Sequence, residues 1–106
     1  PALLDEVRAV LEPRWPGPPH RRWTNAWRRH PAVARLAAEP TVLDALAELY
    51  GRRPVPFQTL NFRAGSQQRL HADTVHFDTL PTGWMCGVWV AIEDVGLDQG
   101  PVQLVT

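Results

Sequence analysis

The spacing of apolar residues changes at Gly51, and this change constrains the fold more than any other feature of the chain. Before it, residues 2–12 place apolar side chains three and four positions apart, and Pro13 stops the pattern, which predicts a helix. After it, the apolar segments are rich in β-branched and aromatic residues and are separated by turn sequences, as is typical of strands. Helices followed by strands predict an α+β fold or an all-β domain with a helical prefix.

Two further helices are predicted before this change in spacing. Pro31 suits the first turn of a helix over residues 31–39, because its missing N–H has no partner to lose there. A helix over residues 41–50 has Thr41 in position to cap its start and Gly51 to end it. The apolar residues that this helix is expected to bury are Val42, Leu43, Leu46 and Leu49.

The second part of the chain contains the predicted strands. They are "VPFQTLNFRAG" (55–65), "MCGVWVAIEDV" (85–95) and "PVQLV" (101–105), and turn residues such as glycine and proline separate them. We therefore expect a single domain with a helical segment over residues 1–53 and a mainly β segment over residues 54–106.

Composition limits the function classes. The chain has 106 residues, which is one small domain at most, and its 44% hydrophobic content is enough for a packed core. A net charge of zero argues against a protein built to bind polyanions. Cys86 is the only cysteine, which excludes an internal disulfide and fits a reducing compartment, and we expect it to be a small core residue of its strand.

The same composition argues against a membrane protein. No apolar run approaches the roughly 20 residues that span a bilayer, and charged residues interrupt any signal-like segment at the start. A soluble, cytoplasmic protein with no membrane partner is the default expectation.

Residues 20–30 alternate arginines with Trp23 and Trp27, a pattern that proteins binding single-stranded nucleic acid also use. The alternative is one or two turns of a solvated helix whose tryptophans anchor it to the domain. We favour the anchoring role and expect no nucleic-acid partner, because the chain is neutral and its basic stretch is short.

Two H-x-D motifs follow one another in "HADTVHFD" (71–78), the first made by His71 and Asp73 and the second by His76 and Asp78. In an unbroken strand the two pairs point to opposite faces, so one metal cannot easily bind all four side chains. A histidine and a carboxylate on a β scaffold, with coordination positions left open, are the arrangement of non-haem Fe(II) oxygenases. A lone H-x-D also arises often by chance, and an ordinary surface or core histidine is the alternative.

The wider sequence strongly resembles the phytanoyl-CoA dioxygenase family of Fe(II)- and 2-oxoglutarate-dependent oxygenases. The resemblance covers roughly residues 30–106. It includes the helical "HPAVARLAAEPTVLDALAELYG", the "GSQQ" that precedes the first H-x-D, the "GVWVAIEDV" strand and the "GP" turn after it. It implies a double-stranded β-helix, a cupin-like jelly-roll with helices packed outside. It also implies that His71 and Asp73 are iron ligands and that His76 and Asp78 are not.

The resemblance extends to the cosubstrate. Thr59 and Asn61, two apart on their strand, are similar to positions that line 2-oxoglutarate, and Trp89 is similar to a tryptophan beside it. Plain core packing is the alternative for Trp89. The family's distal histidine ligand and the arginine that pairs with 2-oxoglutarate match no residue up to Thr106, so we expect the β-helix to be incomplete in this chain.

The implied reaction is hydroxylation of a small-molecule C–H bond by dioxygen, coupled to decarboxylation of 2-oxoglutarate to succinate. A carboxylate at position 73 favours hydroxylation, because halogenating relatives lose it. The alternative is a non-catalytic β-sandwich binding module, or a degenerate fragment without the full set of metal ligands. Fe(II)-dependent succinate formation would distinguish the oxygenase from these non-catalytic alternatives.

An incomplete jelly-roll leaves the inner faces of its strands exposed. Trp89, Val90 and Ile92 are the side chains most affected, each forfeiting about 1.5–3 kcal/mol of burial. We therefore expect the 106 residues alone to aggregate, to form a homodimer through the open sheet, or to need further strands for stability.

Overall fold

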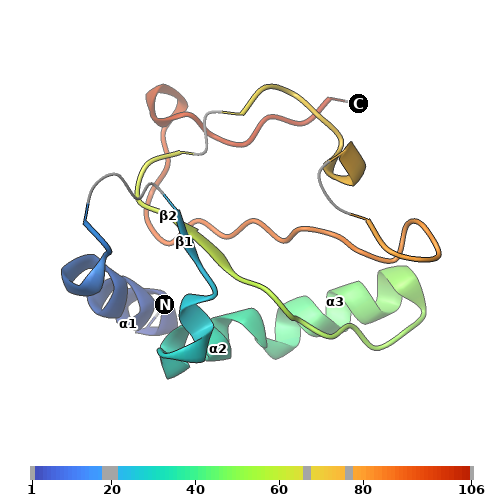
Figure 1. The fold of residues 1–106 in the computed structure, drawn as a ribbon, viewed down its shortest axis with the longest axis horizontal. Coiled ribbons are helices and arrows are strands. Elements are labelled where there is room, and N and C mark those ends of the chain that lie inside the picture. The colour runs from blue at the N-terminus through green and yellow to red at the C-terminus, as the bar shows by residue number, and fades with distance from the viewer. Residues whose placement is uncertain (1, 18–21, 66–67, 76–77, 106) are drawn as a thin grey trace. The chain divides into compact units, whose positions relative to one another are not determined.

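A computed structural model describes residues 2–17, 22–65, 68–75 and 78–105 (Figure 1). The chain forms two compact units, Pro1–Ala64 and Gly65–Thr106, which are considered in turn.

The first unit contains the helices predicted from the sequence. They are α1 (Ala2–Leu11), α2 (Pro31–Ala37) and α3 (Pro40–Tyr50), with short 3-10 turns η1 (Glu12–Arg14) and η2 (Ala26–Arg28). Pro31 and Pro40 each lie in a first helical turn, where proline costs no hydrogen bond, and Gly51 ends α3 in the left-handed conformation at a φ of 63°. The prediction that Thr41 caps α3 is wrong, because Pro40 begins the helix and Glu39 becomes its N-cap residue.

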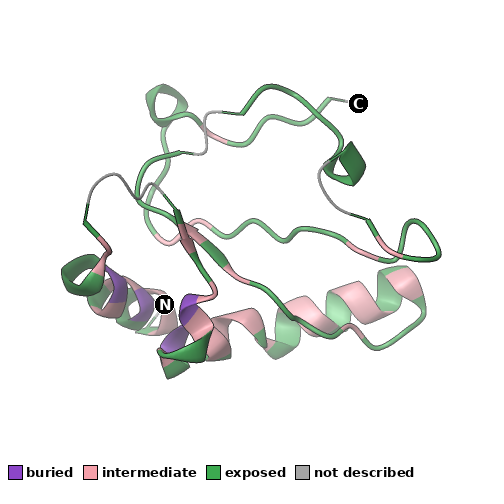
Figure 2. Ribbon diagram, viewed as in Figure 1, coloured by how far each residue is buried: buried purple, intermediate pink, exposed green. Residues whose placement is uncertain are grey.

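The core of this unit lies where α1 and α2 pack together with η2. Its buried residues, which Figure 2 shows on α1 and around the start of α2, are Val7, Leu11, Ala26, Ala32 and Val33. The partly buried Leu3, Trp23, Trp27 and Leu36 pack against them. Glu6 of α1 and Arg35 of α2 form an ion pair across the same two helices. The apolar stripe predicted for residues 2–12 is therefore the one that holds α1 in place.

Helix α3 is only half-buried, and one of its predicted burial positions is wrong. Leu49 is 80% exposed. The half-buried positions of the last turns are Leu46, Ala47 and Tyr50, and Leu49 lies outside that stripe. Val42 and Leu43 are half-buried, in agreement with their predicted side of the helix.

Two segments of this unit pair in a two-stranded antiparallel sheet. β1 (Arg22–Thr24) pairs with β2 (Leu60–Phe62), and Trp23 lies directly opposite Asn61. The centre of each strand is more buried than its neighbours, so Trp23 and Asn61 share the inner face of the sheet.

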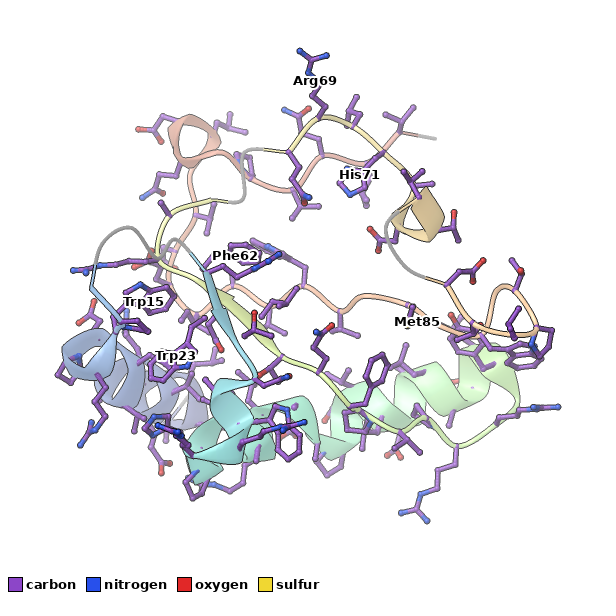
Figure 3. All side chains as sticks on the ribbon, in the orientation of Figure 1. Trp15, Trp23, Phe62, Arg69, His71 and Met85 are labelled. Atoms are coloured by element: carbon purple, nitrogen blue, oxygen red, sulfur yellow. The ribbon has the colours of Figure 1, made fainter. Side chains whose placement is uncertain are left out.

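The tryptophans of residues 20–30 anchor this region to the core, as predicted. Trp23 and Trp27 both pack against the buried cluster, and Trp23 also contacts Trp15 edge-to-face at 5.9 Å between ring centroids (Figure 3). The predicted helical turn is present only as η2, while Trp23 lies in a strand. His20 lies outside the described residues.

The second unit contains two 3-10 turns, η3 (Asp73–Val75) and η4 (Leu97–Gln99), and little other regular structure. Residues 84–95 are neither helix nor strand, and residues 101–105 make no ladder. Among the described residues β1 and β2 are the only strands, so the prediction of a mainly β, double-stranded β-helix is wrong for this structure. Alternating apolar residues mark the side chains to be buried, but a strand forms only when its backbone N–H and C=O groups find a partner strand.

Several apolar side chains of this unit are consequently accessible. Trp89 is 57% exposed and Val90 is 40% exposed, whereas Ile92 is half-buried. Cys86 is exposed, which corrects its predicted place in the core. Gly83 has a φ of 91° and is the turn residue that the sequence indicated. Within the described residues, no helix has the length and apolar character needed to cross a membrane.

Candidate metal centre

A turn, and not a strand, brings His71 and Asp73 together. His71 follows a bend at Leu70, and Asp73 begins the 3-10 turn η3, which the N–H of Val75 closes by donating to the carbonyl of Ala72 at 3.0 Å. As a result, Nε2 of His71 lies 3.7 Å from Oδ1 of Asp73. The two side chains lie close together, although the strand geometry from which a shared face was predicted is absent.

The imidazole of His71 is oriented by the backbone. Its Nδ1 atom lies 2.6 Å from the carbonyl oxygen of Arg69. A carbonyl oxygen can only accept, so Nδ1 carries the proton in this contact, and in the neutral ring Nε2 keeps its lone pair on the side of Asp73. Metal-binding histidines are commonly held in this way, with the ring nitrogen that does not bind metal donating to a carbonyl. Figure 3 shows the Arg69 side chain pointing outward and the His71 ring turned to the opposite side.

The two side chains offer a donor set that suits Fe(II). Two ligand atoms held at about 2.1 Å and at right angles on one metal are about 3 Å apart, so the observed 3.7 Å needs only a small adjustment. The side chain of His71 is 25% exposed and that of Asp73 is 55% exposed, which leaves both accessible to a metal and to further ligands. Across the described ranges, no three histidine, cysteine or acidic side chains are grouped closely enough to hold a metal. The pair therefore fits iron as two ligands of a larger set.

Asp78, the acidic residue of the second H-x-D, has a different role. Its Oδ1 atom accepts hydrogen bonds from the backbone N–H of Thr79 at 2.8 Å and of Gly83 at 3.1 Å. The hydrogen bond from Thr79 has the largest effect and that from Gly83 the next, and both lower the pKa of the Asp78 carboxyl because they stabilise its ionised form. A hydrogen bond with the side chain of Thr82 lowers the same pKa further. The hydroxyl of Thr79 supports the same loop by donating to the carbonyl of Pro81 and accepting from the N–H of Trp84.

Of the second H-x-D, only Asp78 lies among the described residues, and it belongs to a loop. Asp78 organises the backbone of residues 78–84, which is an ordinary structural use of a carboxylate in a turn. His76 lies outside the described residues. The loop contacts of Asp78 give a physical reason for preferring the first pair as a metal site, in addition to the family resemblance.

Asn61 is the half-buried central residue of β2 and lies opposite Trp23 of β1, and the half-buried Thr59 directly precedes β2. Oγ1 of Thr59 and Oδ1 of Asn61 are buried, and neither has a hydrogen-bond partner among the described residues. Buried polar atoms of this kind ordinarily bind something, be it water or a ligand. Their role beside 2-oxoglutarate, like that of Trp89 in the second unit, stays a prediction.

Asn25 is an organising residue that the sequence did not single out. It has a φ of 58°, and its Oδ1 accepts from the N–H of Thr59 at 3.3 Å and from Nε1 of Trp27 at 3.3 Å. Its own N–H donates to the carbonyl of Thr59 at 2.8 Å. Asparagine tolerates the left-handed conformation better than most residues, and this preference was the available signal.

Comparison with protein families places this geometry in context. Residues 8–106 match the family described as phytanoyl-CoA dioxygenase (PhyH). The chain belongs to the phytanoyl-CoA dioxygenase family. The match confirms the family resemblance drawn from the motifs and extends it toward the N-terminus to include the end of α1. Searches of curated proteins and of solved structures gave no match.

Proposed function

We propose that this member of the phytanoyl-CoA dioxygenase family is an Fe(II)- and 2-oxoglutarate-dependent oxygenase that hydroxylates a small-molecule substrate. His71 and Asp73 are two of the iron ligands in this proposal. The observation that carries it is the approach of Nε2 of His71 to Oδ1 of Asp73, with the other ring nitrogen held by the carbonyl of Arg69. Both residues lie within the segment that matches the family.

The chain's own residues have distinct roles. His71 offers a neutral nitrogen whose direction is fixed by its backbone contact, and Asp73 offers a carboxylate that compensates part of the metal's charge. Iron, when bound, supplies the activation of dioxygen that couples decarboxylation of 2-oxoglutarate to oxidation of a C–H bond. Thr59 and Asn61 supply polar groups for the cosubstrate, a role supported by their buried side-chain oxygens, which have no hydrogen-bond partner among the described residues. The apolar cosubstrate role of Trp89 rests on the family resemblance alone.

A non-catalytic binding module is the second candidate. It is favoured by one observation, that the described residues contain no group of three side chains able to hold a metal. In that case His71 and Asp73 form only a weak, exposed ion pair when the histidine is protonated. A cytoplasmic location, the lack of a nucleic-acid partner and a homodimeric state also remain predictions of the sequence.

Succinate formation from 2-oxoglutarate tests the proposal. The whole protein, including any natural sequence that adjoins these residues, is assayed with and without Fe(II), first in the absence of substrate and then with a panel of small molecules. We expect Fe(II)-dependent succinate that is abolished in His71→Ala and in Asp73→Ala and retained in the matched variant His76→Ala. Iron-independent turnover, or turnover that survives both ligand substitutions, contradicts the proposal. The absence of any succinate contradicts it as well and favours the binding module.

A further inference from the structure

Gly87 lies against the carboxylate of Asp73. A Cβ atom built on Gly87 would be 3.2 Å from Oδ2 of Asp73, which is closer than ordinary van der Waals contact. Apart from the chain neighbours of Gly87, no other described heavy atom lies within 4 Å of that position. The space left by the missing side chain therefore faces one atom, and that atom belongs to the proposed metal ligand.

The backbone does not explain why position 87 is a glycine. Gly51, Gly83 and Gly100 have φ angles of 63°, 91° and 69°, a conformation that other residues rarely adopt. Gly87 is not among the glycines with positive φ, so its backbone can accept an alanine without strain. The close approach to Asp73 is therefore the constraint that a side chain at position 87 would meet.

We infer that Gly87 is a positioning residue for Asp73, an inference that rests on the proposed iron site. The carboxylate places Oδ1 toward Nε2 of His71 and Oδ2 toward the position that a Cβ atom of residue 87 would occupy. A methyl group at position 87 pushes Oδ2 aside by a few tenths of an ångström, and the rigid carboxylate carries Oδ1 with it. Because the side chain of Asp73 is 55% exposed, it can move without disturbing a packed core. The effect therefore falls on the geometry of the metal ligands and not on folding.

The experiment compares Gly87→Ala with Gly65→Ala in the whole protein. Gly65 belongs to the same unit, and a Cβ there meets no atom of the described residues within 4 Å, so it controls for the general effect of replacing glycine by alanine. The readouts are Fe(II) affinity by titration, the visible absorption of Co(II) bound in place of iron, and the thermal melting temperature without metal. We expect Gly87→Ala to weaken Fe(II) affinity about 10-fold, the scale known for groups that orient metal ligands, and to change the Co(II) spectrum. Its melting temperature without metal should match that of Gly65→Ala.

The outcomes separate this inference from the proposed function. If the unsubstituted protein binds Fe(II) and Gly87→Ala binds it equally well with an unchanged Co(II) spectrum, Gly87 does not position Asp73, while the iron site stands. If the unsubstituted protein binds no Fe(II), both ideas fail together.

A variant at Asp73 covers the case in which Gly87→Ala folds poorly. In an Asp73→Ala background the atom that the new methyl group meets is gone, so adding Gly87→Ala should cost no further stability. A melting temperature lowered equally in both backgrounds shows that the methyl group meets something other than the carboxylate, which overturns the inference.

Discussion

Nε2 of His71 and Oδ1 of Asp73 lie 3.7 Å apart, although no strand aligns them. The bend at Leu70 and the 3-10 turn that begins at Asp73 create this proximity, and the carbonyl of Arg69 fixes the ring. The pair has the form expected of two ligands of one metal, within a segment that matches the phytanoyl-CoA dioxygenase family.

The first prediction concerns metal binding by the two H-x-D motifs. His71→Ala and Asp73→Ala should each weaken Fe(II) binding by more than about 100-fold, because loss of a ligand costs more than loss of a group that orients one. His76→Ala should leave most of the affinity intact. Isothermal titration of the whole protein under anaerobic conditions measures all three. An equal loss in His76→Ala would mean that the wrong pair was chosen.

The second prediction concerns the tautomer of His71. In the neutral ring the proton should reside on Nδ1, because the Arg69 carbonyl at 2.6 Å can only accept a hydrogen bond. Nitrogen-15 chemical shifts of the imidazole distinguish the two tautomers in metal-free protein. A ring protonated mainly on Nε2 would contradict the geometry and would leave the wrong nitrogen facing Asp73.

The third prediction concerns the pH dependence of the loop at residues 78–84. The N–H donors of Thr79 and Gly83 make the pKa of Asp78 lower in the folded loop than the ordinary value of about 3.9. The ionised carboxylate therefore stabilises the loop above that ordinary value, and the contribution is lost as the pH falls from there through the lowered pKa. Hydrogen exchange and amide shifts of Thr79 and Gly83 should report this release.

Asp78→Asn is the control for that titration. The amide keeps an oxygen that can accept from the same two N–H groups but does not titrate, so the acid-dependent change at Thr79 and Gly83 should disappear. Amides that respond to acid equally in both proteins would show that another group controls the loop.

The fourth prediction concerns the core of the first unit. Val7 is 0% exposed, so Val7→Ala should lower the free energy of unfolding by about 1–3 kcal/mol through lost burial and a residual cavity. Val55→Ala is the same substitution at a site 77% exposed in the same unit, and should change stability by less than about 0.5 kcal/mol. Urea unfolding measures both. Similar losses at the two positions would place the core elsewhere.

The fifth prediction concerns Asn25. Asn25→Ala removes the acceptor for the Thr59 and Trp27 N–H groups and puts a less tolerant residue at a φ of 58°, so it should cost about 1–3 kcal/mol. Asn25→Gly loses the hydrogen bonds but accepts the φ, and Asn25→Asp keeps an acceptor oxygen. The loss measured by urea unfolding should therefore be largest for alanine. Equal losses for alanine and glycine would mean that the backbone conformation has no energetic weight.

Local patterns in the sequence predicted the helical part of this protein well. Three local signals defined the helices: the apolar spacing of α1, the prolines that begin α2 and α3, and Gly51 at the end of α3. Each depends on residues close together in the chain. The motifs spread over residues 30–106 were likewise sufficient to identify the family. The assignment of His71 and Asp73 as iron ligands also came from that resemblance and stays a prediction.

Tertiary structure decided what depends on partners distant in sequence. Residues 85–95 have the composition of a strand, but a strand needs hydrogen bonds to a neighbouring strand, and in the part of the chain that the structure describes such a ladder forms only between β1 and β2. The exposure of Cys86 and Leu49 and the loop role of Asp78 depend in the same way on which groups come close in space. Side-chain periodicity can specify which residues favour burial, but only the folded chain supplies the surfaces and backbone groups that they meet.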